Sequence, residues 1–181
     1  MLVPKKLFMS RGVGYHQEKL TSFEMALRNA GIASFNLVRV SSIFPPHCRI
    51  LTKDRGLEEL VPGQVVFSVI SKNTTSTPNQ PIVASIGLAR PRDPNMYGYL
   101  SEHQGFEQTE QVAGSYAEDL AAEMLATSLG VSFDPDQSWD KKREMWEISG
   151  KIVETTSTTQ FAVGNCNGKW TTVIATAILL L

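Results

Sequence analysis

Apolar residues recur at helical spacing in the first third of the chain. Four of them lie at positions i, i+3, i+7 and i+10, which is one face of an α-helix: Leu20, Phe23, Leu27 and Ala30. Thr21 and Glu24 have the spacing of a capping box, and Gly31 suits the position after the last helical turn. The pattern predicts a helix that ends at Gly31.

A second and longer helical pattern covers residues 109–129 and stops before Gly130. Apolar side chains repeat on it every four residues, at Val112, Tyr116, Leu120 and Met124. Alanines stand beside them, at Ala113, Ala117 and Ala121. We therefore expect a long helix here, with the alanines beside the larger apolar residues.

Seven other segments alternate between apolar and polar positions or are rich in β-branched residues, which is typical of strands. They are residues 6–10, 35–40, 64–71, 81–89, 97–103, 145–160 and 170–181. The segment Gly12-Val13-Gly14, residues 134–140 and residues 161–170 are predicted turns or loops. The polar stretch NTTSTPNQ is expected to join 64–71 and 81–89 as an antiparallel hairpin. The chain has no linker or repeat, so we expect a single layered α+β domain over residues 1–181.

Composition and charge exclude some classes of function. Hydrophobic residues make up 42% and charged residues 19%, as in an ordinary globular protein. The net charge of −1 gives a nucleic-acid partner no global electrostatic support. The apolar end, residues 171–181, is too short to span a bilayer, and MLVPKKLFMSRG lacks the apolar core of a signal peptide. We therefore expect an intracellular, cytoplasmic protein with no membrane partner.

Metal and disulfide chemistry have little support in the sequence. Cys48 and Cys166 do not form a metal-binding motif, and we expect both to be free, buried thiols. His16, His47 and His103 have no ligand spacing with one another or with a cysteine. We expect no metal.

The stretch NLVRVSSIFPP, residues 36–46, places a serine pair between a predicted strand and a rigid double-proline turn. The simplest interpretation is a strand end that leads into a turn. A serine hydrolase would need a base such as His47, but the chain has no G-x-S-x-G motif. A third interpretation is attack of the Ser42 hydroxyl on the Ser41 carbonyl, followed by chain cleavage, which needs a strained turn and a donor for the oxyanion.

A wider resemblance favours the third interpretation. The stretch FEMALRNAGIASFNLVRVSSIFPP closely resembles the pyruvoyl-dependent arginine decarboxylases, and GYLSEHQG resembles that family's strand with a catalytic glutamate. The resemblance implies cleavage between Ser41 and Ser42, which gives a β chain of residues 1–41 and an α chain of residues 42–181. It implies that Ser42 becomes a covalent pyruvoyl group, and that L-arginine is converted through a Schiff base to agmatine, a polyamine precursor, and CO2.

The same resemblance implies roles for three further residues, and an architecture. Asn36 would support processing and the site, Glu102 would be the proton donor, and Glu24 would bind the guanidinium of the substrate. The implied architecture is a four-layer αββα sandwich with mostly antiparallel sheets. The implied assembly is a homotrimer of processed protomers with active sites between subunits.

The residues themselves leave alternatives open for two of these roles. Glu102 needs apolar neighbours to stay protonated as a general acid, and Tyr97, Tyr99, Leu100 and Phe106 surround it in sequence. It can equally be an exposed carboxylate at a strand end. Glu24 can close a capping box with Thr21 or pair with Arg28 one helical turn later.

Two alternative functions also remain open at this point. The same chemistry can act on another amino acid such as histidine. The chain can instead be an unprocessed, non-catalytic oligomeric binding protein on the same fold.

Overall fold

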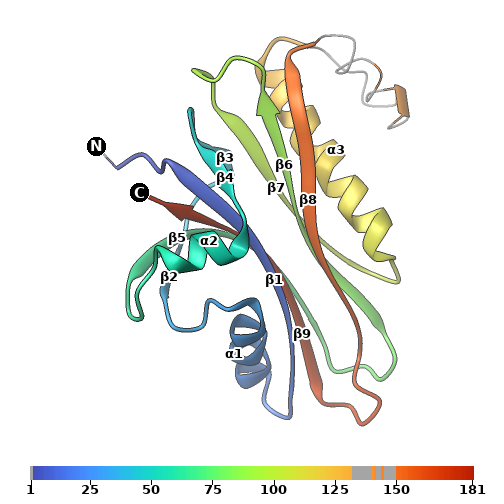
Figure 1. The fold of residues 1–181 in the computed structure, drawn as a ribbon. Helices are drawn as coiled ribbons and strands as arrows, with labels where there is room; N and C mark the ends of the chain where they lie inside the picture. Colours follow the sequence, from blue (N-terminus) through green and yellow to red (C-terminus); the bar gives the residue numbers. More distant parts are fainter. Residues whose placement is uncertain (1, 132–139, 142–143, 145–149) are drawn as a thin grey trace.

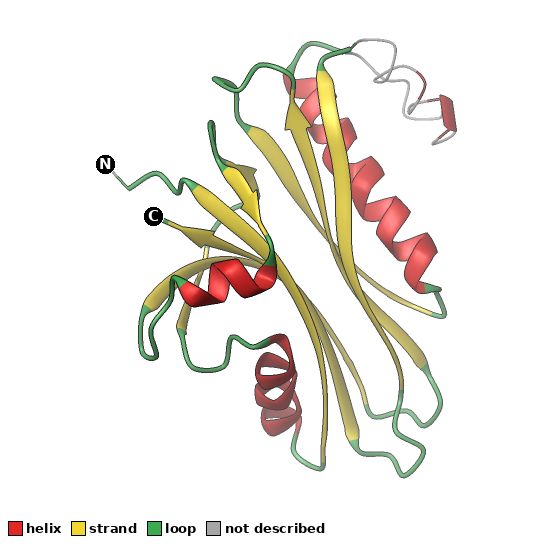
Figure 2. Ribbon diagram, viewed as in Figure 1, coloured by secondary structure: helices red, strands yellow, loops and turns green. Residues whose placement is uncertain are grey.

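The computed structural model describes residues 2–131, 140–141, 144 and 150–181, and within them it contains nine strands and three helices (Figures 1 and 2). The elements in chain order are β1 (Lys6–His16), α1 (Lys19–Ala30), β2 (Asn36–Arg39), β3 (Ile43–Phe44), β4 (Arg49–Leu51), α2 (Lys53–Glu58), β5 (Val65–Thr75), β6 (Pro81–Pro91), β7 (Gly98–Phe106), α3 (Glu110–Ser128), β8 (Ile152–Val163) and β9 (Trp170–Leu180). The predicted α+β class is confirmed.

The strands form two sheets. The five-stranded sheet has the order β2-β5-β9-β1-β4, in which β2–β5 and β1–β4 are parallel pairs and the others are antiparallel. The four-stranded sheet, β3-β7-β6-β8, is antiparallel throughout. The sheets are therefore mostly antiparallel, as expected. β1 pairs with β9 along its whole length, from Lys6 opposite Leu180 to His16 opposite Trp170.

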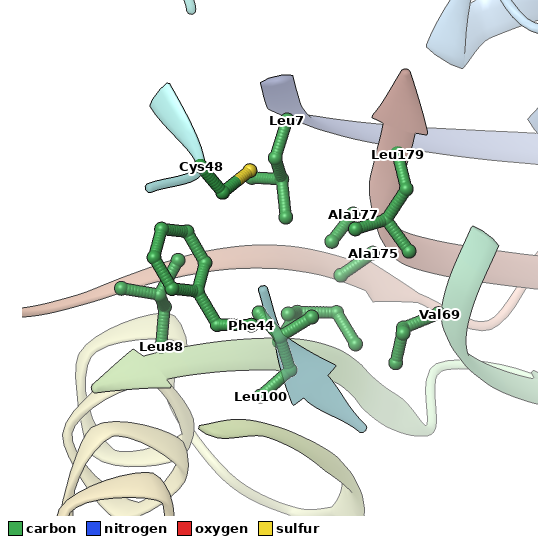
Figure 3. Packing of buried hydrophobic residues seen from close by; sticks show 10 residues of the cluster. Leu7, Phe44, Cys48, Val69, Leu88, Leu100, Ala175, Ala177 and Leu179 are labelled. Carbon is green, nitrogen blue, oxygen red and sulfur yellow. The ribbon is translucent and has the colours of Figure 1, made fainter. Parts of the chain in front are cut away.

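A hydrophobic core joins the inner faces of the two sheets (Figure 3). The five-stranded sheet contributes Leu7, Val69, Ala175, Ala177 and Leu179, and the four-stranded sheet contributes Phe44, Ile86, Leu88 and Leu100. Burying an aliphatic side chain of this size stabilises a fold by roughly 1.5 to 3 kcal/mol. Phe44 and the nearby Cys48 belong to this cluster, so the segment that follows the serine pair is anchored in the core.

The helices cover the outer faces of the sheets. Ala26 and Ala30 of α1 pack with Ile174 and Ile178 of β9 in one cluster. Ala121, Ala122 and Leu125 of α3 pack with Ala89 and Ile152 of the four-stranded sheet in another. Figure 2 shows α1 and α2 beside one sheet and α3 along the other.

The predicted turn at residues 12–14 is wrong, because β1 runs through it without interruption. The reason is the close approach of α1. A Cβ on Gly12 would lie 2.2 Å from the carbonyl oxygen of Ala26, and one on Gly14 would lie 2.1 Å from that of Ser22. These glycines therefore make room for a helix instead of bending the chain.

The predicted hairpin of residues 64–71 and 81–89 is also wrong. β5 and β6 are consecutive strands, but β5 pairs with β2 and β9, whereas β6 pairs with β7 and β8. The turn between them carries the chain from one sheet to the other. Both strands can be long and apolar because each is covered on both faces.

Both long helices form where the periodicity places them, and on α1 Phe23, Leu27 and Ala30 pack into the core as the pattern indicates. α1 starts at Lys19 with no side-chain cap, so Thr21 and Glu24 form no capping box, and Leu20 is 80% exposed. Gly31 ends the helix in a left-handed conformation, as predicted. On α3 the alanine stripe is buried, while Val112, Tyr116 and Met124 are exposed. Small residues form the buried stripe because helix and sheet approach closely.

The remaining expectations have mixed outcomes. Residues 145–149 of the predicted strand 145–160, and residues 134–139 of the predicted loop, lie outside the described residues, and β8 covers 152–163. Both cysteines are free, but Cys166 is exposed, so its expected burial is wrong. None of the helices within the described residues is long and apolar enough to cross a membrane.

Candidate functional site

The serine pair lies between β2 and β3, where the chain passes from the edge of the five-stranded sheet to the edge of the four-stranded sheet. Ser41 is exposed and Ser42 is half-buried. Val40 N–H still bonds to the Ser68 carbonyl of β5 at 3.0 Å. The Ser41–Ser42 peptide is thus the crossing point between the two sheets.

Backbone hydrogen bonds hold this peptide on both sides. The N–H of Ile43 donates to the Ser41 carbonyl oxygen at 2.9 Å, which closes a tight turn centred on Ser42. The N–H of Leu100 on β7 donates to the Ser42 carbonyl oxygen, also at 2.9 Å. Ser42 is not among the described residues with a positive φ, so the turn is fixed by hydrogen bonds and not by a left-handed backbone. The Ser41 carbonyl therefore has a donor in place on its oxygen.

Glu102 lies near the serine pair because of the same strand pairing. It is two residues after Leu100 on β7, hence on the same face of the sheet and about 7 Å further along the strand. Its side chain is 31% exposed, and its Oε2 accepts a hydrogen bond from Arg39 Nη2 at 2.6 Å. The other oxygen, Oε1, accepts no hydrogen bond within the described part of the chain.

A cavity of about 460 Å³ surrounds this ion pair. It is lined by Arg39, Glu102, Phe23, Ile70, Ser71, Lys72 and Gln104. The lining is more polar than the apolar surroundings that the sequence suggested for Glu102. A second cavity of about 310 Å³ lies by Val40 and Ser41 and is lined mostly by apolar side chains.

Asn36 is not brought to Ser42 within one chain. It opens β2, and its Nδ2 donates to the Gly63 carbonyl oxygen at 2.7 Å. β2 is extended, at about 3.3 Å per residue. Asn36 therefore lies at the end of this strand away from the serine pair, and its side chain is exposed.

Glu24 also points elsewhere in the single chain. Its Oε1 accepts a hydrogen bond from Arg28 Nε at 2.6 Å, which is the helical pairing considered from the sequence. Its side chain is 41% exposed. The adjacent Phe23 lines the cavity around Glu102, although Glu24 itself does not.

The side chains of His16 and His103 have local partners. His103 Nε2 lies 2.8 Å from Gln108 Oε1, and its ring packs edge-on against Tyr116 of α3. It therefore faces α3, whereas the adjacent Glu102 faces Arg39 of the other sheet. His16 Nδ1 accepts a hydrogen bond from the Glu18 amide. No cluster of three metal-ligand side chains occurs among the described residues.

Two parts of the site were missed by the sequence reasoning. Arg39 is three residues before Ser42 and was treated only as part of a strand, although a charge on a short edge strand could have drawn attention to it. The Ile43 amide carries no sequence signal, because any residue except proline supplies the same donor.

Comparison with known proteins identifies the relatives of this chain. Residues 6–181 match the sequence model of the family "Pyruvoyl-dependent arginine decarboxylase (PvlArgDC)". The chain is 54% identical to a pyruvoyl-dependent arginine decarboxylase of Nitrosopumilus maritimus over 180 residues, which cover 99% of this chain and 98% of the relative. It is 51% identical to one of Methanococcoides burtonii over 180 residues, with 99% and 100% covered. A probable pyruvoyl-dependent arginine decarboxylase of Chloroherpeton thalassium is 53% identical over 178 residues, with 98% of each chain covered.

Proposed function

The chain belongs to the pyruvoyl-dependent arginine decarboxylase family, and from that premise we propose that Ser42 is the source of its pyruvoyl group and Glu102 its proton donor. The protein decarboxylates L-arginine to agmatine and CO2 and uses a pyruvoyl group as its cofactor. The observation that carries the residue assignment is the hydrogen-bonded turn at Ser42 beside the Glu102 strand.

The geometry at the serine pair supports self-cleavage. The Ser42 hydroxyl attacks the Ser41 carbonyl carbon, and the negative charge that develops on the Ser41 oxygen is stabilised by the Ile43 N–H that already binds it. The peptide becomes an ester, and elimination then leaves Ser41 as a carboxylate and residue 42 as a dehydroalanine. Water would then hydrolyse the imine tautomer of that residue, which releases ammonia and leaves the pyruvoyl group at residue 42. Cleavage at this position divides the single domain into residues 1–41 and 42–181.

When joined to the substrate amine, the pyruvoyl group would supply an electron sink for the electron pair that CO2 leaves behind. Loss of CO2 leaves an electron pair on the former α-carbon, which must take up a proton. Glu102 delivers this proton. Its Oε1 is available to carry the proton while its Oε2 holds Arg39.

The substrate guanidinium requires an acidic partner, which we propose to be Glu24. In the single chain Arg28 occupies this carboxylate, and Asn36 is remote from Ser42. Both assignments become consistent when a second protomer brings these residues to the site, so we propose a homotrimer with active sites between subunits. The expected cytoplasmic location stays a prediction.

The packing supports the finer architecture as well. The order α1 and α2, five-stranded sheet, four-stranded sheet, α3 fits the four-layer αββα sandwich. β2 and β3, which flank the serine pair, are edge strands of the two sheets, so a neighbouring protomer can complete the site there.

Mass spectrometry of the purified protein, followed by an amino-acid screen for CO2 release, tests this proposal. We expect two fragments that break between Ser41 and Ser42, with a blocked N-terminus on the larger one, and CO2 release from arginine above all other amino acids. A single intact chain would favour the non-catalytic alternative. Preference for histidine would favour the other substrate.

A further inference from the structure

Another charged cavity is lined in part by the segment that follows Ser42. Its volume is about 440 Å³. It is bounded by the β3–β4 connection, which carries Phe44, His47 and Arg49, and by the end of β6 with Arg90 and the following Arg92. It shares no lining residue with the cavity around Glu102.

The side chains that line this cavity are positively charged, although the whole chain has a net charge of −1. Three guanidinium groups line it, and one of them, Arg90, pairs with Glu154 at 2.8 Å. The side chains of Arg49 and Arg92 form no hydrogen bond or ion pair with the described residues. The adjacent acid, Asp93, is engaged elsewhere, since its Oδ1 accepts hydrogen bonds from both amides of Asn95 at 2.9 Å.

A buried donor without a partner lies in the same place. The Nε of Arg90 is fully buried and has no hydrogen-bond partner within the described residues, and it is the only such side-chain atom found there. Buried polar groups are rarely left in this state, because an unmade hydrogen bond costs stability. The strand register also shifts here, since Arg90 is opposite Glu154 whereas Pro91 is opposite Ile152, which is the spacing of a bulge in β8. Bulges occur often beside functional sites, where they redirect a side chain.

We propose that this cavity binds a small oxyanion of the phosphate or carboxylate class through Arg49, Arg90 and Arg92. Guanidinium groups bind such anions in pairs of parallel hydrogen bonds, which is why arginine predominates in oxyanion sites. An oxyanion in the cavity would compensate the positive charge of the unpaired guanidinium groups of Arg49 and Arg92. It would also offer a partner to the buried side of Arg90.

The site has a structural connection to the serine pair. Phe44 and Cys48 point into the core between the sheets (Figure 3). The residues between them are held further by a hydrogen bond from the His47 amide to the Pro94 carbonyl oxygen at 3.1 Å. An anion held between Arg49 and Arg92 would link the segment that begins at Ser42 to the end of β6. The binding itself does not depend on the role proposed for Ser42.

Isothermal titration of the full-length protein tests the proposal. The probes are inorganic phosphate, pyrophosphate and citrate, each compared with sodium chloride at equal ionic strength. We expect saturable binding of at least one probe, with one site per chain. The Arg49→Gln/Arg92→Gln double variant should bind it roughly tenfold or more weakly, since it loses charge-assisted hydrogen bonds. Tighter binding of pyrophosphate than of citrate indicates a phosphate ligand, and the reverse order indicates a carboxylate.

The matched control is Arg28→Gln/Arg55→Gln, which removes the same charge from two exposed arginines outside the cavity. It should bind the probe as the wild type does. Thermal melts without anion check that each variant folds, and the single variants Arg49→Gln and Arg92→Gln replace the double variant if it does not. Absence of saturable binding to all three probes would overturn the proposal. Equal weakening in the control pair would do the same, because it would mean a non-specific charge effect.

Discussion

Arg39 Nη2 on β2 lies 2.6 Å from Glu102 Oε2 on β7, so one ion pair joins the edge of the five-stranded sheet to an interior strand of the four-stranded sheet. The same guanidinium nitrogen donates to the Ile70 carbonyl oxygen at 2.9 Å. The arginine is thus held at two points, and it orients the carboxylate from one side only.

This relationship predicts the behaviour of Arg39→Gln. The pair is largely exposed, so its loss should cost at most about 1 kcal/mol and lower the melting temperature by no more than about 4 °C. Turnover of arginine should fall about tenfold, because Glu102 loses the donor that orients it. Steady-state kinetics on the processed variant measure this effect. Arg39→Lys should recover part of the loss, whereas unchanged turnover in Arg39→Gln would reduce the pair to a surface contact.

Ser42→Ala should leave the chain intact and inactive, because the attacking hydroxyl is gone. Ser41→Ala should still be cleaved, since residue 41 supplies only its carbonyl group and the Ile43 amide still binds that oxygen. Denaturing gel electrophoresis and intact-mass measurement distinguish the uncut chain from two fragments. Cleavage of the Ser42→Ala chain at the same bond would refute the proposed chemistry.

Glu102→Gln keeps the shape of the side chain but removes the transferable proton. Self-cleavage should continue, while decarboxylation should fall on the order of a hundredfold or more, the scale of a lost general acid. Steady-state measurement of agmatine formation on fully processed protein gives the rate, because CO2 leaves before Glu102 delivers its proton. Glu58→Gln on α2, an exposed carboxylate that lines none of the three cavities, is the control and should keep its activity. Normal turnover in Glu102→Gln would exclude the carboxylate as proton donor.

Glu24→Gln separates substrate binding from helix stability. If Glu24 binds the guanidinium, the variant loses a charge-assisted hydrogen bond worth roughly 1.5 to 3 kcal/mol, and the KM for arginine should rise about ten- to a hundredfold. Arg28→Gln breaks the same helical ion pair but spares the carboxylate. Its KM should therefore stay near that of the wild type. Matching losses in the two variants, with matching drops in melting temperature, would assign Glu24 to the helix alone.

Cys48 and Cys166 should differ in reactivity. Burial raises the pKa of the Cys48 thiol to about 11, whereas Cys166 is exposed in the turn before β9. A thiol reagent at pH 8 should label one cysteine in the native protein and two after denaturation. Because the unfolded chain ionises Cys48 at lower pH than the folded one, its contribution to stability is complete below about pH 9 and declines as the pH rises towards 11. Cys48→Ala should remove that decline, and labelling of both native thiols would contradict the prediction.

Local patterns were enough to predict where most elements lie. The helix expected over 109–129 is α3, Glu110–Ser128, and the strand expected over 170–181 is β9, Trp170–Leu180. These segments depend on periodicity within the segment itself. Identity of the buried face was harder to predict, because an alanine stripe is recognised as the interface only once the opposing sheet is known to be close.

The errors and omissions come from contacts between distant residues. Gly12 and Gly14 were read as a turn because the helix that requires them packs from further along the chain. Arg39 was missed because its partner is 63 residues away in the other sheet. The resemblance to known decarboxylases supplied the candidate residues Ser42, Glu102, Asn36 and Glu24. In one chain, strand pairing links only the first two, since Leu100, two residues before Glu102, hydrogen-bonds to Ser42.

The full-length pairing of β1 with β9 has a consequence for the processed protein. The proposed cleavage after Ser41 would separate β1, α1 and β2 covalently from all other elements, yet β1 would remain an interior strand between β9 and β4. The product is then a two-polypeptide complex whose smaller member cannot leave without breaking a sheet apart. Folding of the uncut precursor is a first-order process, whereas reassembly of the cut chains would be second-order and depend on concentration. Processing would therefore convert a reversible fold into one whose persistence depends on the rate of unfolding.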